Sequence, residues 1–171
     1  MRPDSVNALA PEDIESLRSL KAEYFYWMDT KQWDRLRALF TDEARYEGFP
    51  FSMAGPDRWV AGLRSFMAAA VSQHRGSEFR HRLCPDGRVR GVWAMTDYVT
   101  WEPGTIVYRG VPVPDMYGFR GYGYYEEEYV RDAGRWRIDF MRLTRVRIDP
   151  VVVRLPEAHY DVPAPQVDWL D

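Results

Sequence analysis

The stretch GVWAMTDYVTW at residues 91–101 alternates between two kinds of side chain along its whole length. Its odd positions are apolar, except for a carboxylate at Asp97. Successive side chains of a β-strand point to opposite faces, so one face of this strand is expected in the protein interior. A buried carboxylate is costly unless it is paired, which makes Asp97 either a candidate for acid–base chemistry or a structural residue tied to an Arg or a backbone N–H.

Helical periodicity precedes this strand. A first helix is expected from Pro11, whose fixed φ and the acidic residues after it suit a helix N-terminus. A second, shorter helix is expected after Asp29 or Thr30, and a third after Gly55-Pro56. Apolar residues recur in them at three- and four-residue spacing: Ile14, Leu17, Leu20, Tyr24 and Met28, then Trp33, Leu36, Leu39 and Phe40, then Trp59, Leu63, Phe66, Met67 and Ala70.

After Gly76 the pattern becomes alternating, which predicts β-strands. The expected strands are residues 78–84, 88–101, 118–131 and 135–148, with a short one near 44–49. Helices followed by meandering strands indicate an α+β domain, in which N-terminal helices pack in a curved antiparallel sheet.

The expected organisation is one domain over residues 1–150 and a proline-rich tail over residues 151–171. Within the domain, the Pro- and Gly-rich residues 102–117 predict a long hairpin connection or a lid. In the tail, Trp169 and Leu170 are available to dock on the domain.

Composition and charge exclude several classes of protein. The chain has 171 residues and a net charge of −3, with 23 basic and 26 acidic residues, so no nucleic acid or membrane is expected as a partner. Cys84 is the single cysteine, and no apolar run reaches membrane-spanning length, so we expect a cytoplasmic protein without disulfides. The aromatic content of 15% suits either a pocket for an apolar ligand or a bulky core.

The last expected strand repeats the anomaly of Asp97. Arg145 is expected on one face with Met141 and Leu143, and a second face carries Trp136, Ile138 and Phe140. The guanidinium could pair with Asp97 or bind a substrate oxygen. Arg142 and Arg147 are competitors for this role, and a solvated surface charge is the alternative.

Three residues outside the strands are also candidates. Asp29 lies at the negative end of the first helix dipole, where a carboxylate is unfavourable unless it caps the next helix or has a function. His74, expected between the third helix and a turn at Gly76, is a candidate general base. Tyr24 shares the end of the first helix with Asp29. The other histidines, His81 and His159, have no evident partner, and no zinc site is expected.

Several segments together resemble the SnoaL-like proteins of the nuclear-transport-factor-2-like superfamily. They are LKAEYFYWMD (residues 20–29), Trp33-Asp34, Leu39-Phe40, His74-Arg75-Gly76, GVWAMTD (residues 91–97) and Gly134 through Arg145. The resemblance spans about residues 12–148 and is nearest to the bile acid 7α-dehydratase branch, with scytalone dehydratase more distant. It implies a cone-shaped α+β fold with the helices packed in the sheet.

The resemblance also implies a catalytic set, which by position falls on Tyr24, Asp29 with His74, Asp97 and Arg145. Where the family often has a second histidine, this chain has Ser77. Contacts to the substrate are expected from Trp93, Met95, Met141 and Leu143.

The function implied by this resemblance is that of a dehydratase without cofactor or metal, acting on a hydroxylated polycyclic or steroid-like molecule. His74 would remove a proton from carbon, Tyr24 would donate to the developing oxyanion, and Asp97 would protonate the departing hydroxyl. The alternatives are a ketosteroid isomerase, a polyketide cyclase or an epoxide hydrolase, a non-catalytic small-molecule binder, and a subunit like the small subunit of ring-hydroxylating dioxygenases. A homodimer or homotrimer is expected by analogy.

Overall fold

A computed structural model of the protein describes residues 8–50, 54–102, 104–105, 107–108, 111–112, 115–153 and 165–171. Its helices and strands follow one another in the order α1 (Pro11–Asp29), α2 (Trp33–Arg37), β1 (Phe40–Glu47), α3 (Pro56–Met67), β2 (Ala70–Leu83), β3 (Val89–Trp101), β4 (Val107–Tyr108), β5 (Val111–Pro112), β6 (Gly118–Asp132) and β7 (Arg135–Val151).

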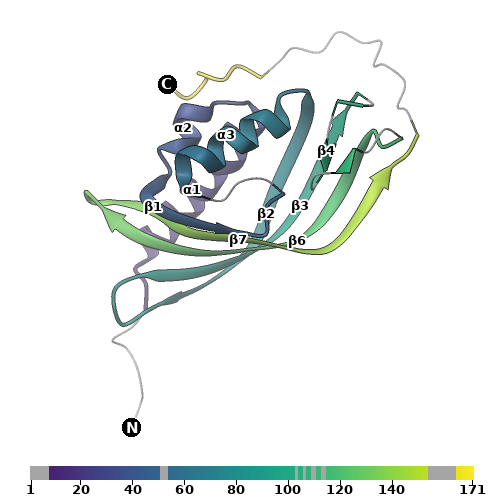
Figure 1. Ribbon diagram of the computed structural model, residues 1–171. Coiled ribbons are helices and arrows are strands. Elements are labelled where there is room, and N and C mark those ends of the chain that lie inside the picture. The colour runs from purple at the N-terminus through teal and green to yellow at the C-terminus, as the bar shows by residue number, and fades with distance from the viewer. Residues whose placement is uncertain are drawn as a thin grey trace.

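The five long strands form one curved sheet in the order β1-β7-β6-β3-β2, and the three helices lie in its concave side (Figure 1). The expected α+β fold is therefore confirmed. Four strands are antiparallel to their neighbours, whereas β1 joins the edge parallel to β7. The short strands β4 and β5 pair in a separate hairpin within the connection that the Pro and Gly content had indicated. No helix in the described ranges is long and apolar enough to cross a membrane.

Strand β2 begins eight residues earlier than the expected strand at 78–84, and this changes the place of His74. The third helix ends at Met67, Ala70 opens β2, and His74 pairs with Asp97 in register. The expected turn at Gly76 is therefore wrong. Gly76 lies inside the strand, at a point where a Cβ would come within 2.6 Å of the Phe25 ring. The absence of a side chain at this position therefore permits the close approach of α1 to β2.

Strand β7 contains an irregularity that the alternating pattern did not reveal. Tyr129 pairs with Ile138 and Glu128 pairs with Phe140, so Asp139 is an additional residue on β7. An extra residue turns the following side chains to the opposite face. Trp136 and Ile138 consequently face the interior together with Met141, and the prediction that they share a face with Phe140 is wrong.

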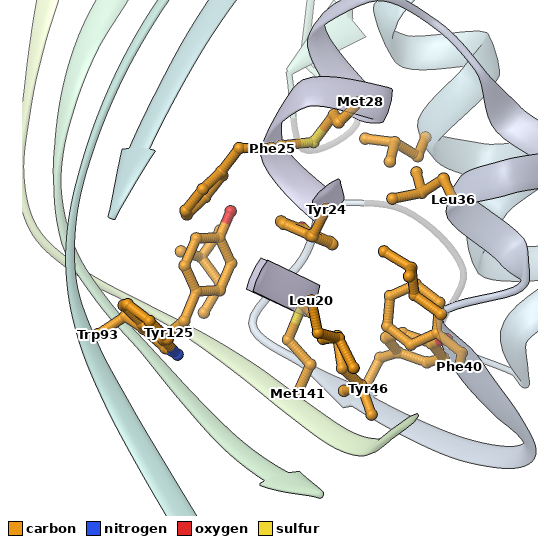
Figure 2. Close-up of a cluster of buried hydrophobic side chains, with 14 of the residues drawn as sticks. Leu20, Tyr24, Phe25, Met28, Leu36, Phe40, Tyr46, Trp93, Tyr125 and Met141 are labelled. Carbon is orange, nitrogen blue, oxygen red and sulfur yellow. The ribbon is translucent and has the colours of Figure 1, made fainter. Parts of the chain in front are cut away.

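The core fills the space between α1 and the concave face of the sheet, and it is rich in aromatic rings (Figure 2). Tyr24 of α1 lies with its ring centroid 5.7 Å from that of Tyr125 on β6 and 6.2 Å from that of Phe40 on β1. The core therefore forms where α1 packs against the concave face of the sheet.

The end of the C-terminal tail contacts α1 and α2, next to which it lies in Figure 1. The Tyr26 hydroxyl donates to the carbonyl oxygen of Gln166 at 3.0 Å, and Arg35 binds the Asp171 carboxylate. The side chains of Trp169 and Leu170, which were available to dock on the domain, are exposed. A backbone carbonyl and a carboxylate therefore hold the end of the tail against α1 and α2.

The shifted face of β7 gives a stability test. We expect Ile138→Ala to lower the free energy of unfolding by about 2–5 kcal/mol, since it removes a fully buried side chain. Val146→Ala, on the exposed part of the same strand, should change it by less than about 0.5 kcal/mol. Urea denaturation of both variants measures the difference. Equal losses would contradict the inward orientation of Ile138.

Candidate active site

The end of α1 and the middle of β2 meet at Asp29 and His74. The Asp29 carboxylate accepts hydrogen bonds from Ser72 Oγ and from the backbone N–H of His74, each at 2.7 Å, and lies 2.7 Å from His74 Nδ1. Asp29 therefore does not cap α2, whose N-cap is Gln32 without a side-chain cap hydrogen bond. With a proton on Nδ1 directed at Asp29, the Nε2 atom of a neutral His74 is left as the acceptor.

Asp97 of β3 and Arg145 of β7 form a two-point ion pair. Arg145 Nη1 and Nη2 donate to the two oxygens of Asp97 at 2.8 and 2.6 Å. Strand β6 lies between these strands, and the pair crosses it at Gly121. A Cβ at Gly121 would be 2.0 Å from both Arg145 Nη1 and Asp97 Oδ1, so only glycine leaves room for the crossing. Of the three competing arginines, Arg142 pairs with Glu126 and Arg147 with Asp149, both on exposed surface.

These two pairs are adjacent. His74 Nε2 lies 3.8 Å from Asp97 Oδ2, and the side chains of His74 and Asp97 are 7% and 1% exposed. A second carboxylate therefore faces the ring nitrogen opposite to the one that Asp29 binds.

Tyr24 and Tyr125 complete the polar wall. The Tyr24 hydroxyl is buried and makes no hydrogen bond of normal geometry within the described part of the chain. Burial, followed by the neighbouring Tyr125, raises the pKa of Tyr24 well above its usual value. The hydroxyl therefore stays protonated and can act only as a neutral hydrogen-bond donor or acceptor.

A cavity of about 50 Å³ joins these groups. Its polar wall is Tyr24, His74, Asp97, Tyr125 and Arg145, and its other wall is formed by Met28, Gly48, Phe49, Pro50, Leu63, Phe66, Met67, Val99, Phe119 and Leu143. Four of the five candidate catalytic residues thus line one cavity, and Asp29 lies behind His74.

The residues expected to contact a substrate are mostly elsewhere. Leu143 lines the cavity, whereas Trp93 stacks on Phe79 with ring centroids 4.2 Å apart. Met95 Sδ lies 3.8 Å from Arg145 Nη1, and Met141 is fully buried in the core. Most of the apolar wall comes instead from the helices and from the residues after β1. Sequence periodicity had assigned the helical residues to the core and had not singled out those after β1.

Two buried charges were not predicted. Lys21 of α1 and Glu127 of β6 pair inside the sheet with Nζ and Oε1 2.5 Å apart. Both residues interrupt an apolar pattern in the sequence, which could have revealed them. Lys21 falls in the apolar stripe of α1, and Glu127 falls between Tyr125 and Tyr129 on an apolar strand face. Within the described ranges, no group of three or more His, Cys, Asp or Glu side chains is arranged to hold a metal ion.

A curved sheet that holds helices and a polar cavity on its concave side defines the class of cone-shaped α+β proteins. A sequence model described as the SnoaL-like domain matches residues 10–142, and the chain belongs to this family. The expected family is thereby confirmed, whereas nothing in these similarities singles out the bile acid dehydratase branch.

Several known proteins are similar in sequence or structure. The "Probable cyclase FGR4" of Gibberella zeae is 24% identical over 152 residues, which cover 81% of this chain and 95% of that protein. A candidate scytalone dehydratase from Novosphingobium aromaticivorans superimposes with a TM-score of 0.67 at 15% identity, covering 89% of this chain and 96% of that one. The hexachlorocyclohexane dehydrochlorinase LinA-type3 of Novosphingobium barchaimii gives a TM-score of 0.67 at 16% identity and the same coverage. At such identities the structural likeness establishes the fold alone.

The crossing at Gly121 leads to a direct prediction. We expect Gly121→Ala to separate Asp97 from Arg145, because the new methyl group occupies the position of both side-chain ends. Overpacking of this kind should lower the free energy of unfolding by about 1–3 kcal/mol. A crystal structure of the variant and its urea denaturation midpoint test both effects. Retention of the two hydrogen bonds at unchanged stability would contradict the crossing geometry.

Proposed function

We propose that the protein is a dehydratase that needs no cofactor, with His74 as its general base and the small cavity as its reaction site. The observation that carries this proposal is the orientation of His74. One ring nitrogen is fixed by Asp29 at 2.7 Å, and the other faces the cavity beside Asp97. A base held in one tautomer and aimed at a largely apolar cavity is suited to removing a proton from carbon.

The first step is the removal of a proton from the carbon next to a carbonyl or conjugated group. The electron pair of the broken C–H bond moves toward the carbonyl oxygen, which gains negative charge. Tyr24 supports this step, since its buried hydroxyl stays protonated and lines the same cavity. Hydrogen-bond donors preorganised at a developing oxyanion are usually the largest single source of rate enhancement.

In the second step the C–O bond breaks and the departing hydroxyl takes the proton that His74 received in the first step, so it leaves as water and His74 returns to its neutral form. Asp97, held as a carboxylate by Arg145, lies 3.8 Å from His74 Nε2 and places a negative charge beside the imidazolium between the two steps. Arg145 binds both Asp97 oxygens and keeps the side chain directed at the cavity. The cycle consumes and releases no net proton.

The relatives support elimination chemistry and also a second candidate. The names of two structural neighbours, a scytalone dehydratase and a dehydrochlorinase, denote loss of water and loss of hydrogen chloride. The relative named as a cyclase favours ring closure as the alternative. Cyclisation and isomerisation begin with the same proton removal, and they differ from dehydration in whether the product has lost the mass of one water.

The proposed substrate is a hydroxylated polycyclic or steroid-like molecule, which must widen the cavity to enter. A volume of about 50 Å³ accommodates the reacting end only, because pockets for whole drug-sized ligands measure about 300–1,000 Å³. Met28 and Met67 belong to the wall, and methionine side chains rearrange more readily than branched or aromatic ones. The apolar wall is therefore the part that adapts to the rest of the substrate.

The roles of His74 and Asp29 give the central test. We expect His74→Ala and Asp29→Asn each to lower kcat by at least about 10²-fold on a hydroxylated polycyclic substrate, because the base is lost or loses its orientation. His81→Ala, on the exposed part of the same strand, is the matched control and should retain full activity. Mass spectrometry of the products measures loss of water. Turnover by His74→Ala within a few-fold of the parent would refute the proposal, and ligand binding without turnover in the parent would indicate a binding protein.

The size of the cavity gives a second test. We expect Met67→Ala to raise kcat/KM for four-ring substrates relative to one-ring substrates, because the apolar wall retreats by several atoms. Arg64→Ala, on the exposed side of the same helix, should leave the ratio unchanged. Competition assays with paired substrates measure the ratio directly. An unchanged ratio in Met67→Ala would show that the cavity is not where the additional rings bind.

A further inference from the structure

The ion pair between Lys21 and Glu127 is not used by the proposed mechanism, although it lies beside the cavity. The two side chains are 1% and 0% exposed, and no other ion pair of the described residues is as fully buried at both ends. A buried ion pair is seldom a net source of stability, because desolvation of both charges offsets their attraction, and apolar residues of similar size often serve as well. A functional role for the Lys21–Glu127 pair is therefore considered from its contacts.

The carboxylate end of the pair is anchored in the sheet. One oxygen of Glu127 binds Lys21 at 2.5 Å, and the other accepts a hydrogen bond from the Tyr129 hydroxyl. That hydroxyl in turn accepts a hydrogen bond from Trp93 Nε1 at 2.8 Å. Strands β3 and β6 thus fix the position of the negative charge, and with it the position of the ammonium group.

The ammonium end is packed on aromatic rings. Lys21 Nζ lies 3.7 Å from the ring centroid of Tyr125, 4.0 Å from that of Tyr24 and 4.8 Å from that of Phe25. The pair is therefore a dipole with its positive end against the rings of the two tyrosines that line the cavity. The other oxygen of Glu127 is bound by Tyr129, so it is the ammonium group that contacts the ring faces.

We propose that Lys21 is a positioning residue for the reaction, whose charge strengthens Tyr24 and Tyr125 as hydrogen-bond donors to the substrate oxygen. A cation on the face of a phenol ring is attracted by the ring electrons and draws them away from the hydroxyl. The O–H bond becomes more polar, and it responds more strongly to an oxygen that gains negative charge in the cavity. This inference rests on the proposed function, in which Tyr24 donates to that oxygen.

The charge of Lys21 has its own pH dependence. Burial lowers the pKa of Lys21 from the usual 10.5 to about 8, against the opposing effect of Glu127. The titratable groups that face it are Glu127 and Tyr125 from β6 and Tyr24 from its own helix. The ammonium is therefore lost as the pH rises through about 8, and kcat should fall with it.

The stability of the protein should change in the opposite direction. The folded-state pKa of Lys21 lies below the unfolded one, so between about pH 8 and 10.5 the unfolded chain binds more protons at this group. The contribution of Lys21 to the free energy of unfolding therefore rises with pH across that window. Loss of activity above pH 8 through this group is thus distinguishable from unfolding.

The first experiment compares two double variants. One removes the buried ion pair on the concave side of the sheet, and the other removes an exposed ion pair on its outer side. Lys21→Met with Glu127→Gln removes both buried charges and retains the side-chain volumes. Arg142→Met with Glu126→Gln removes an exposed pair on the outer side of β6 and β7 and is the matched control. We expect the buried double variant to lose about tenfold in kcat at an unchanged KM, since removing a donor outright costs about 10²–10³-fold. It should also lose the fall in kcat near pH 8, which the control retains.

The second experiment needs no turnover and so separates this inference from the proposed function. Protein labelled with ¹³C at the tyrosine Cζ is titrated from pH 6 to 10 by NMR, with Tyr24 and Tyr125 assigned from their Phe variants. Both resonances should shift with a common midpoint near the Lys21 pKa of about 8 in the parent and in the control. They should not do so in the buried double variant. Resonances that are insensitive to this titration in the parent, or an unchanged kcat in a folded buried double variant, would overturn the role of Lys21.

Discussion

Helix α1 covers the concave side of the sheet, and the structure depends on how the charged side chains buried between them are neutralised. Three charged residues of the described chain are buried, namely Lys21, Asp97 and Glu127. A charge in such a place is tolerated only when an opposite charge or several hydrogen bonds meet it. Lys21 and Glu127 neutralise each other, and Asp97 is met by Arg145 from the neighbouring part of the sheet. Each pair joins two elements that are distant in sequence, so the folded arrangement is required for either to exist.

Two glycines of the sheet leave room for side chains that pack at or beside the candidate active site. Asp97 and Arg145 reach each other only across β6, and Gly121 leaves the space for them. Gly76 plays the equivalent part for Phe25, whose ring lies parallel to that of His74 at a centroid distance of 6.5 Å. Gly121 thus leaves space for an ion pair of the candidate active site, and Gly76 leaves space for a ring that stacks on His74.

Sequence periodicity predicted the elements whose side chains alternate without interruption. The buried face of β3 followed directly from residues 91–101, and Asp97 was recognised because it broke that face. The inward face of β7 was missed because a single additional residue, Asp139, reverses the alternation and leaves no signature in composition. Lys21 was missed for a different reason. A long aliphatic stem fits a helical apolar stripe, so periodicity alone does not distinguish a buried lysine from an apolar residue.

The cavity has a polar wall and an apolar wall, and this division suggests how one fold can support several reactions. The polar wall comes mainly from the sheet, where hydrogen-bonded strands hold His74, Asp97 and Arg145 in fixed relation, and in the proposed mechanism this wall removes the proton. The apolar wall comes largely from α1, α3 and the residues after β1, and among its members Met28, Phe66 and Met67 make no contribution to that step. Which bond forms or breaks after proton removal depends on how the remaining part of the substrate lies against this second wall. Under the proposed mechanism, the apolar wall of such a fold can therefore decide between outcomes such as dehydration and cyclisation after the same proton removal.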